Sequence, residues 1–294
     1  MSIIMRLPDS MGCTVASTAV IKSVIEQYKN EDIKVITPFP DLLIGFKCIE
    51  IINSNECGID IFDVDLREYT KRRPHNSLPF RSSYIHMIEM AENQINDQLK
   101  RMTPEIILNE HEEEWAKKEI KKYPFPLIWI QSISTSSNRL WPEENWKELK
   151  NTFLGIYSFI DLSTAGYSLR ESLAIAKYSF SGVCLDSFMV HGSAAVNANN
   201  VLVILGSSRP ECVTYPGQYV FYKNIECNLQ PCAMHGYFNG CKKEHESLFY
   251  QKNCIYPQHK CMNSISTKDV IETIKSFGKY KRLNMVRKQY DYNL

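Results

Sequence analysis

Residues 180–195, which read FSGVCLDSFMVHGSAA, decide the fold class of this chain. The first six residues are largely apolar, the polar pair Asp186-Ser187 follows them, and small residues fill positions 192–195. A short apolar run without polar alternation is typical of a strand that is buried on both faces of a parallel sheet. Small residues allow the next helix to pack closely on that sheet. The segment therefore predicts a strand, a polar turn and a helix, the repeating unit of α/β proteins.

Apolar runs and helical patterns alternate along the rest of the chain in the same way. The further strands are expected at residues 3–7, 33–36, 48–52, 59–62, 127–133 and 201–205, and the helices before residue 28 and at residues 83–101, 142–153 and 267–277. Gly278 is expected to end the last helix, because glycine is common just after a helix. Strands that alternate with helices predict parallel sheets that are covered on both faces.

The alternation of strands and helices restarts near the middle of the chain, which predicts two domains. A length of 294 residues is also about twice the usual size of one domain. Residues 111–122 are charged almost throughout, and Pro124 and Pro126 follow them, so we place the junction there. The sequence thus predicts an α/β fold with two Rossmann-like domains, residues 1–122 and 123–294, whose parallel sheets face each other across a cleft.

The composition is that of a globular protein, and it argues against some classes of partner. Hydrophobic residues make up 44% of the chain and charged residues 23%. The formal net charge of +1 gives no argument for nucleic-acid binding, which normally needs a clustered basic face. Apolar runs fall short of the roughly 18–20 residues that span a bilayer, and Arg6 and Pro8 interrupt the N-terminal run. We therefore expect no transmembrane segment, no signal peptide and a cytoplasmic location.

Ten cysteines need an explanation in a reducing compartment, where structural disulfides are rare. Five of them are scattered, and each is most simply a small buried hydrophobic residue: Cys13, Cys48, Cys57, Cys184 and Cys212. The other five gather near the C-terminus: Cys227, Cys232, Cys241, Cys254 and Cys261.

The gathered cysteines predict a structural metal site. Four thiolates suit one tetrahedral zinc or iron ion, and the four chosen here are Cys232, Cys241, Cys254 and Cys261, with Cys227 in reserve. Three histidines lie among them and could replace a cysteine: His235, His245 and His259. The spacing is not that of paired CxxC motifs, so free thiols are the alternative. A structural role is favoured over a catalytic one, because nothing in the sequence argues for an open coordination position.

Polar segments follow several of the predicted strands, where α/β sheets bind their ligands. In the loop at residues 8–13, Gly12 permits close approach of the backbone. The loop at residues 134–139 offers hydroxyl groups and one guanidinium, a set that suits a diphosphate. Its candidate donor-binding residues are Ser134, Ser136 and Arg139. An ordinary strand-to-helix turn and a plain polar loop would explain both segments equally well.

Two further polar segments follow the strands at residues 180–185 and 201–205. Asp186 and Ser187 lie at the end of the first strand, and His191 lies one turn into the next helix, so three polar groups surround one helix N-terminus. Gly206 begins the turn after the second strand and could line the same pocket. The structural alternative is a capping acid and hydroxyl with a histidine that faces the core.

Three of these motifs, taken together, resemble the heptosyltransferases of glycosyltransferase family 9. Residues 139–142, RLWP, with Trp146 are similar to the family's K-x-W-P…W element. Residues 186–195, DSFMVHGSAA, are similar to its D-S-x-x-x-H-x-A-A-A element, and residues 206–210, GSSRP, to its G-x-T-x-P turn. Order and spacing agree along nearly the whole chain, more weakly in the N-terminal half.

The resemblance implies a GT-B fold and an inverting transfer of heptose, usually from an ADP-linked donor, without a catalytic metal ion. The N-terminal domain would bind the acceptor, a saccharide or a protein hydroxyl, and the C-terminal domain the nucleotide-sugar donor. Arg139 stands at the family's phosphate-binding lysine, and Asp186, Ser187 and His191 match its donor-binding element. The cysteine cluster resembles the tail of the heptosyltransferases that modify proteins, in which cysteines hold a structural iron.

One departure from the family concerns the general base. The family's N-terminal loop reads Gly-Asp, and that aspartate is the proposed base for the acceptor hydroxyl, whereas this chain has Gly12-Cys13. A thiol of ordinary pKa is mostly protonated at neutral pH. Asp9, on the same loop, is the other candidate. The base is therefore one of these catalytic candidates, lies elsewhere or is absent.

Two other classes of function remain as alternatives. Cys13 motivates a catalytically silent relative that binds a nucleotide-sugar or a partner protein as a scaffold. The cysteine cluster alone would suggest a zinc-ribbon-like nucleic-acid module, but the near-zero net charge and the two α/β domains argue against it. Nucleic acid is thus not an expected partner, while the sequence leaves a homo-oligomer open.

Overall fold

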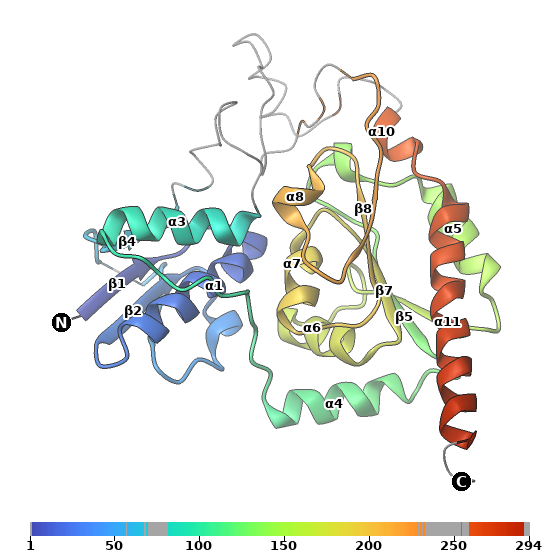
Figure 1. The fold of residues 1–294 in the computed structure, drawn as a ribbon, viewed down its shortest axis with the longest axis horizontal. Helices are drawn as coiled ribbons and strands as arrows, with labels where there is room; N and C mark the ends of the chain where they lie inside the picture. Colours follow the sequence, from blue (N-terminus) through green and yellow to red (C-terminus); the bar gives the residue numbers. More distant parts are fainter. Residues whose placement is uncertain are drawn as a thin grey trace.

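The computed structural model describes residues 2–56, 58–67, 69, 82–227, 230, 232, 254 and 259–290. These residues form two α/β halves, each built on a parallel sheet with helices packed on it, as Figure 1 shows. The α/β class and the two parallel sheets expected from the sequence are confirmed. Within the described residues, none of the helices is both long enough and apolar enough to cross a membrane.

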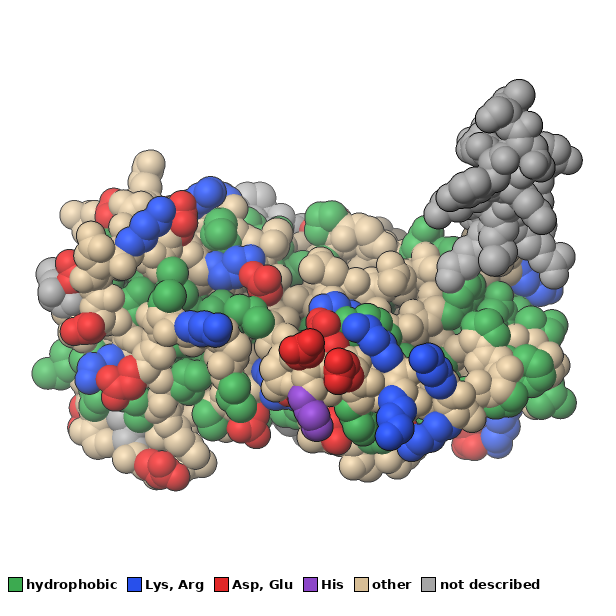
Figure 2. Space-filling view, turned by 90° about the horizontal axis from the view of Figure 1, so that it is seen from below, with side chains coloured by type: hydrophobic (Ala, Val, Ile, Leu, Met, Phe, Trp, Pro, Cys, Tyr) green, Lys and Arg blue, Asp and Glu red, His purple; other side chains and the backbone are tan. Residues whose placement is uncertain are grey.

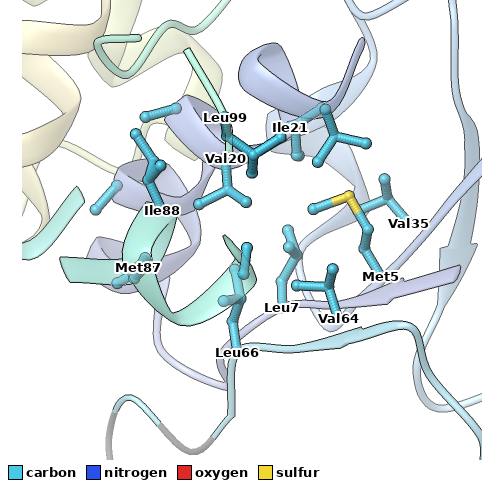
Figure 3. Packing of buried hydrophobic residues seen from close by; sticks show 14 of the residues in the cluster. Met5, Leu7, Val20, Ile21, Val35, Val64, Leu66, Met87, Ile88 and Leu99 are labelled. Carbon is cyan, nitrogen blue, oxygen red and sulfur yellow. The ribbon is translucent and has the colours of Figure 1, made fainter. Parts of the chain in front are cut away.

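The N-terminal sheet has four parallel strands in the order β3-β2-β1-β4. These strands are β1 (Ser2–Arg6), β2 (Asp32–Thr37), β3 (Glu50–Asn53) and β4 (Val64–Asp65). Helices α1 (Met11–Gln27) and α3 (Ser83–Ile95) share one core with the sheet, and the short 3-10 helix η1 (Pro40–Leu43) follows β2. Figure 3 shows this core, in which the labelled side chains are Met5, Leu7, Val20, Ile21, Val35, Val64, Leu66, Met87, Ile88 and Leu99.

Helix α1 is buried along most of its length because it contacts α3 on one side and α7 (Phe188–Ala195) on the other. A helix that is apolar nearly all round is typical of such an interior position. Its buried hydroxyl groups bond to carbonyl groups of the preceding turn: Ser17 Oγ donates to Thr14 O at 2.8 Å, and Ser23 Oγ to Ala19 O at 2.7 Å. Helix α1 thus provides a large part of the contact between the two halves.

The C-terminal sheet has five parallel strands in the order β6-β5-β7-β8-β9. These strands are β5 (Leu127–Gln131), β6 (Ser158–Asp161), β7 (Ser181–Leu185), β8 (Val201–Leu205) and β9 (Tyr219–Tyr222). Every residue of β7 and β8 is buried, as the apolar runs predicted. Helices α5 (Glu143–Thr152) and α11 (Thr267–Tyr290) share one core with the sheet, while α6 (Leu169–Tyr178) and α7 belong to another.

The charged segment that we assigned to the domain junction is a helix, α4 (Glu110–Ile120). It begins at a capping box of Asn109 and Glu112. Acidic residues fill its first turn and lysines its last turn, which complements the helix dipole; Figure 2 shows this charged face. Ala116 packs with Ala174 and other residues of the C-terminal half. The boundary at residue 122 stays a prediction.

Four expectations from the sequence are wrong. Cys48, expected to be buried, is exposed, and the helix expected at residues 83–101 ends at Ile95. No strand forms at residues 59–62, all of which are described; Ile61 is 84% exposed, and β4 begins only at Val64. The apolar residues there do not face a core. The last helix does not end at Gly278 but continues to Tyr290. Glycine ends a helix only where the backbone turns into the left-handed region, and here Gly278 is an interior helical residue beside Tyr157.

Candidate functional site

The first turns of α1 and α7 meet where the strands β1 and β7 end. A Cβ atom placed on Gly12 would lie 3.0 Å from His191 Cδ2, 3.5 Å from His191 Nε2 and 3.8 Å from Phe188 Cα. Ordinary carbon–carbon contacts are about 3.5–4.0 Å. The close backbone approach expected at Gly12 is therefore present, and His191 is the residue that it approaches. Two candidates from opposite halves of the chain are brought together.

Asp186, at the end of β7, contacts polar residues of the loops that follow β5 and β8. Its carboxylate lies 3.4 Å from Arg139 Nε and accepts a hydrogen bond from Ser208 Oγ. Its carbonyl oxygen accepts from Arg139 Nη1 at 3.2 Å and from Ser134 Oγ at 3.3 Å. The side chain of Asp186 is only 2% exposed and that of Arg139 11%. A buried ion pair that also receives neutral donors fixes the guanidinium at the carboxyl edge of the sheet.

The other predicted donor-binding residues lie at the same edge with different partners. Ser187 Oγ donates to Gln131 Oε1 and, at 3.1 Å, to the carbonyl group of Leu185. Ser136 is buried at the start of the short 3-10 helix η2 (Ser137–Arg139). Gly206 instead contacts the C-terminal tail, by which we mean residues 259–290. A Cβ atom on Gly206 would lie 2.5 Å from Met262 Sδ and 2.7 Å from Cys261 Sγ.

The two candidate bases have very different surroundings. Cys13 is buried, and burial raises the pKa of its thiol to about 11, while a hydrogen bond with Ser10 and the Arg139 charge lower it and the Asp186 charge raises it. The thiol is therefore protonated at neutral pH and is no general base, although it lies near the Arg139–Asp186 pair. Asp9 has a side chain that is 66% exposed and accepts from Arg6 Nη2 at 2.8 Å.

Three tyrosines that the sequence reading missed surround this site. Tyr215 Oη lies 2.7 Å from His191 Nδ1, and its ring stacks on that of Tyr84 at a centroid distance of 5.5 Å. Tyr69 is buried, and burial raises its pKa well above the usual range, with further contributions from Cys13, Tyr215 and Asp186. They come from distant parts of the chain and share no spacing with the recognised motifs, so no local signal could have identified them.

Of the residues predicted to bind a metal ion, Cys241, His235 and His245 lie outside the described residues. Burial, together with the charges of Cys227 and Cys254, raises the pKa of Cys232 to about 12 and that of Cys261 to about 11. The four sulfur atoms therefore lie in one region. Among the described side chains, however, no three are arranged to hold a metal ion, so the metal clip is not shown.

A hollow of about 840 Å³ opens beside the start of α5. Trp141 and Trp146 line it and pack edge to face at a centroid distance of 5.0 Å, and Trp141 Nε1 donates to Ile265 O at 3.1 Å. His259 and Asn263, at helix α10 (Lys260–Asn263), close its other side. Trp141 of the RLWP segment and Trp146 of α5 are therefore part of the core, and Trp141 links the start of α5 to Ile265.

Comparison with solved structures identifies the fold. No family model matches the sequence, and no curated protein matches it either. Solved structures do match. The glycosyl transferase family 9 protein from Veillonella parvula superimposes with a TM-score of 0.67 at 12% identity, over 94% of this chain and 96% of that one. The ADP-heptose lipopolysaccharide heptosyltransferase II of E. coli gives 0.61 at 13% identity, over 96% of this chain and 100% of that one.

A third solved structure of similar fold is described as containing iron. The iron-containing dodecameric glycosyltransferase TibC from enterotoxigenic E. coli gives a TM-score of 0.64 at 14% identity, over 95% of this chain and 76% of that one. Identities this low show a shared fold alone. The chain thus has the fold of the heptosyltransferases in glycosyltransferase family 9, and the resemblance read from residues 139–142, 186–195 and 206–210 is confirmed at the level of the fold.

Proposed function

We propose that this protein is an inverting glycosyltransferase, which transfers a sugar from a nucleotide-sugar to a hydroxyl group. The observation that carries the proposal is the junction of Gly12 with His191 beside the buried Arg139–Asp186 pair. It places residues of both halves at the carboxyl edges of two parallel sheets, where such folds bind nucleotides. The acceptor would bind to residues 1–122 and the donor to residues 123–294.

Arg139 supplies the charge that the leaving diphosphate needs. Nε and Nη1 face Asp186, and a guanidinium has five N–H donors, so part of the fork can still bind phosphate oxygen atoms. The N-terminus of α7 adds a positive dipole end beside it. A fixed cation and a helix N-terminus stabilise a developing negative charge in place of a metal ion. We infer an ADP-linked heptose as donor, because one E. coli protein of similar fold is named an ADP-heptose heptosyltransferase and a TibC structure is a complex with ADP-heptose.

Asp9 is our proposal for the general base. Its carboxylate is exposed and stands two residues before α1, whereas Cys13 is buried and protonated. A carboxylate can take the proton of the acceptor hydroxyl as that oxygen attacks the sugar carbon and the diphosphate leaves. The acceptor is a hydroxyl of a saccharide or of a protein. If the protein binds nucleotide-sugars but transfers none, the silent scaffold is the correct alternative, which the buried thiol at position 13 favours.

We also propose one structural zinc or iron ion, held by four of the clustered cysteines. Support comes from the proximity of half-buried Cys232 and Cys254 to buried Cys261, since their thiolate forms would repel one another without a cation. TibC, of similar fold, is described as containing iron. The ion would fasten the tail to Gly206 and take no part in transfer. A homo-oligomer and a cytoplasmic location stay predictions.

The proposal is tested by mixing purified protein with a panel of nucleotide-sugars and following nucleotide release. An ADP-linked heptose should give the fastest release, and the anomeric configuration of the product should be inverted. Binding without release of any nucleotide would favour the scaffold.

A further inference from the structure

The contact between His191 and Tyr215 is a buried polar pair at the junction of the two halves. His191 Nδ1 and Tyr215 Oη are 2.7 Å apart, and both residues are less than 8% exposed. Tyr215 follows the short helix α8 (Pro210–Val213), well separated in sequence from α7. A buried pair at this distance must share one hydrogen, so one of the two atoms donates and the other accepts.

Tyr215 is held rigidly from both halves of the molecule. Its ring stacks on Tyr84 of α3 at an interplanar angle of 15°. Its backbone N–H donates to Gln218 Oε1 at 3.0 Å, and Gln218 Nε2 donates to the carbonyl group of Val190 in α7 at 2.8 Å. The hydroxyl group therefore has one defined position relative to the helix that carries His191.

The surroundings decide which atom donates. Burial raises the pKa of Tyr215 far above its usual range, so its hydroxyl group keeps the proton at neutral pH. Among the described residues, His191 Nδ1 is the hydrogen-bond partner of the Tyr215 hydroxyl group. A buried hydroxyl group whose hydrogen would otherwise have no acceptor donates it, so the tyrosine proton is directed to His191 Nδ1. A neutral imidazole that accepts at Nδ1 carries its own hydrogen on Nε2.

The Nε2 side of the ring faces the other half of the molecule. A Cβ atom on Gly12 would lie 3.5 Å from Nε2, so this nitrogen is directed to the first turn of α1. An N–H group at that place can donate to an oxygen atom between the halves. The Arg139–Asp186 ion pair and the Cys13 thiol lie nearby. The charges of Arg139 and Asp186 both shift the pKa of this thiol.

We propose that Tyr215 is a positioning residue that holds His191 in the Nε2–H tautomer, with this N–H directed to the junction of the halves. The ligand group it addresses is an oxygen acceptor, namely a diphosphate or sugar oxygen. The role in transfer rests on the proposed function, whereas the tautomer does not. Residues of α3 hold the tyrosine and residues of α7 hold the histidine, so both halves define the proton position.

Nitrogen NMR of protein labelled with ¹⁵N-histidine tests the tautomer directly. The chain has seven histidines, and His191→Gln identifies the signals of this one by their loss. In the wild type, Nδ1 should resonate as an unprotonated nitrogen and Nε2 as a protonated one. Tyr215→Phe keeps the ring that stacks on Tyr84 and removes only the hydroxyl group, so both signals should shift toward a mixture of tautomers. Tyr219→Phe, at an exposed tyrosine of β9, is the matched control and should change neither signal.

Transfer kinetics give a second readout. Loss of one orienting hydrogen bond in Tyr215→Phe should lower kcat by about tenfold, which corresponds to about 1.4 kcal/mol. Glutamine at position 191 offers an N–H near the place of Nε2 without needing a tautomer. Tyr215→Phe should therefore cost much less in the His191→Gln background than in the wild type.

The outcomes separate the two proposals. A protonated Nδ1 in the wild type, or signals of His191 that are the same in Tyr215→Phe, would overturn the inference even if sugar transfer is fully active. A wild type that transfers no sugar but shows the Nε2–H tautomer would overturn the proposed function and keep the tautomer.

Discussion

Arg139 and Asp186 form a buried ion pair that joins the loop after β5 to the end of β7, with Nε 3.4 Å from Oδ2. Ser208 from the end of β8 donates to the same carboxylate. Three neighbouring strand ends are thus tied to one another, and the guanidinium stands where the loops of the sheet converge. Removing one member of such a pair leaves the other charge buried, which is costly.

Arg139→Ala should weaken binding of the nucleotide donor by about 1.5–3 kcal/mol, the worth of a charge-assisted hydrogen bond. Calorimetric titration with ADP measures this. The variant should also melt at a lower temperature, because Asp186 loses its cation. Arg101→Ala, which breaks a half-exposed pair with Glu92 in the N-terminal half, is the control and should leave ADP affinity unchanged. An unchanged ADP affinity in Arg139→Ala would remove this residue from the donor site.

Gly12→Ala should destabilise the protein by about 1–3 kcal/mol, because the new methyl group would press on His191. The better helix propensity of alanine offsets at most about 1 kcal/mol. Chemical denaturation measures the change in the free energy of unfolding. Gly58→Ala is the matched control: a Cβ atom there meets no heavy atom within 4 Å in the described part of the chain. Equal stability of Gly12→Ala and the wild type would refute the close contact.

Asp9→Asn should lower turnover by about 10²–10⁴, the usual contribution of a general base, with ADP affinity intact. Cys13→Ala should be nearly neutral in turnover, since burial raises the pKa of its thiol to about 11 and keeps it protonated. Steady-state kinetics of the two variants separate these roles. Full activity in both variants would place the base elsewhere.

Protein purified without oxygen should contain about one zinc or iron ion per chain, and Cys254→Ser should lower that content and the melting temperature. Turnover per folded molecule should not change, because the ion is structural. Cys48→Ser, at an exposed cysteine of the N-terminal half, should keep the metal content. Elemental analysis that finds no metal in the wild type would contradict the metal proposal.

The strands that could be predicted most directly are those whose residues all face the interior. Strands β7 and β8 are buried throughout, so hydrophobicity alone locates them. Residues 59–62 also include apolar side chains, yet Ile61 is exposed. Composition alone cannot distinguish an exposed apolar residue from a buried one. Helix α4 was missed because its stability comes from a capping box and charged ends, and only Ala116 is buried.

The only part of the site that could be predicted from the sequence is the part whose residues lie close together along the chain. Asp186, Ser187 and His191 share one strand–turn–helix unit, so their proximity follows from the sequence. Tyr215 reaches His191 through packing between segments that are distant in the chain. The burial that keeps Cys13 protonated likewise depends on the contact of α1 with α7 and α3, which no spacing reveals.

We propose that the two halves together transfer a sugar from a nucleotide-sugar. The most direct measurement is the anomeric configuration of the product formed from an ADP-linked heptose and a hydroxyl acceptor, determined by NMR in parallel with ADP release. We expect one inverted glycoside for each ADP released, and loss of that product in Arg139→Ala. Glycoside with retained configuration, or no binding of any nucleotide-sugar by folded protein, would contradict the account.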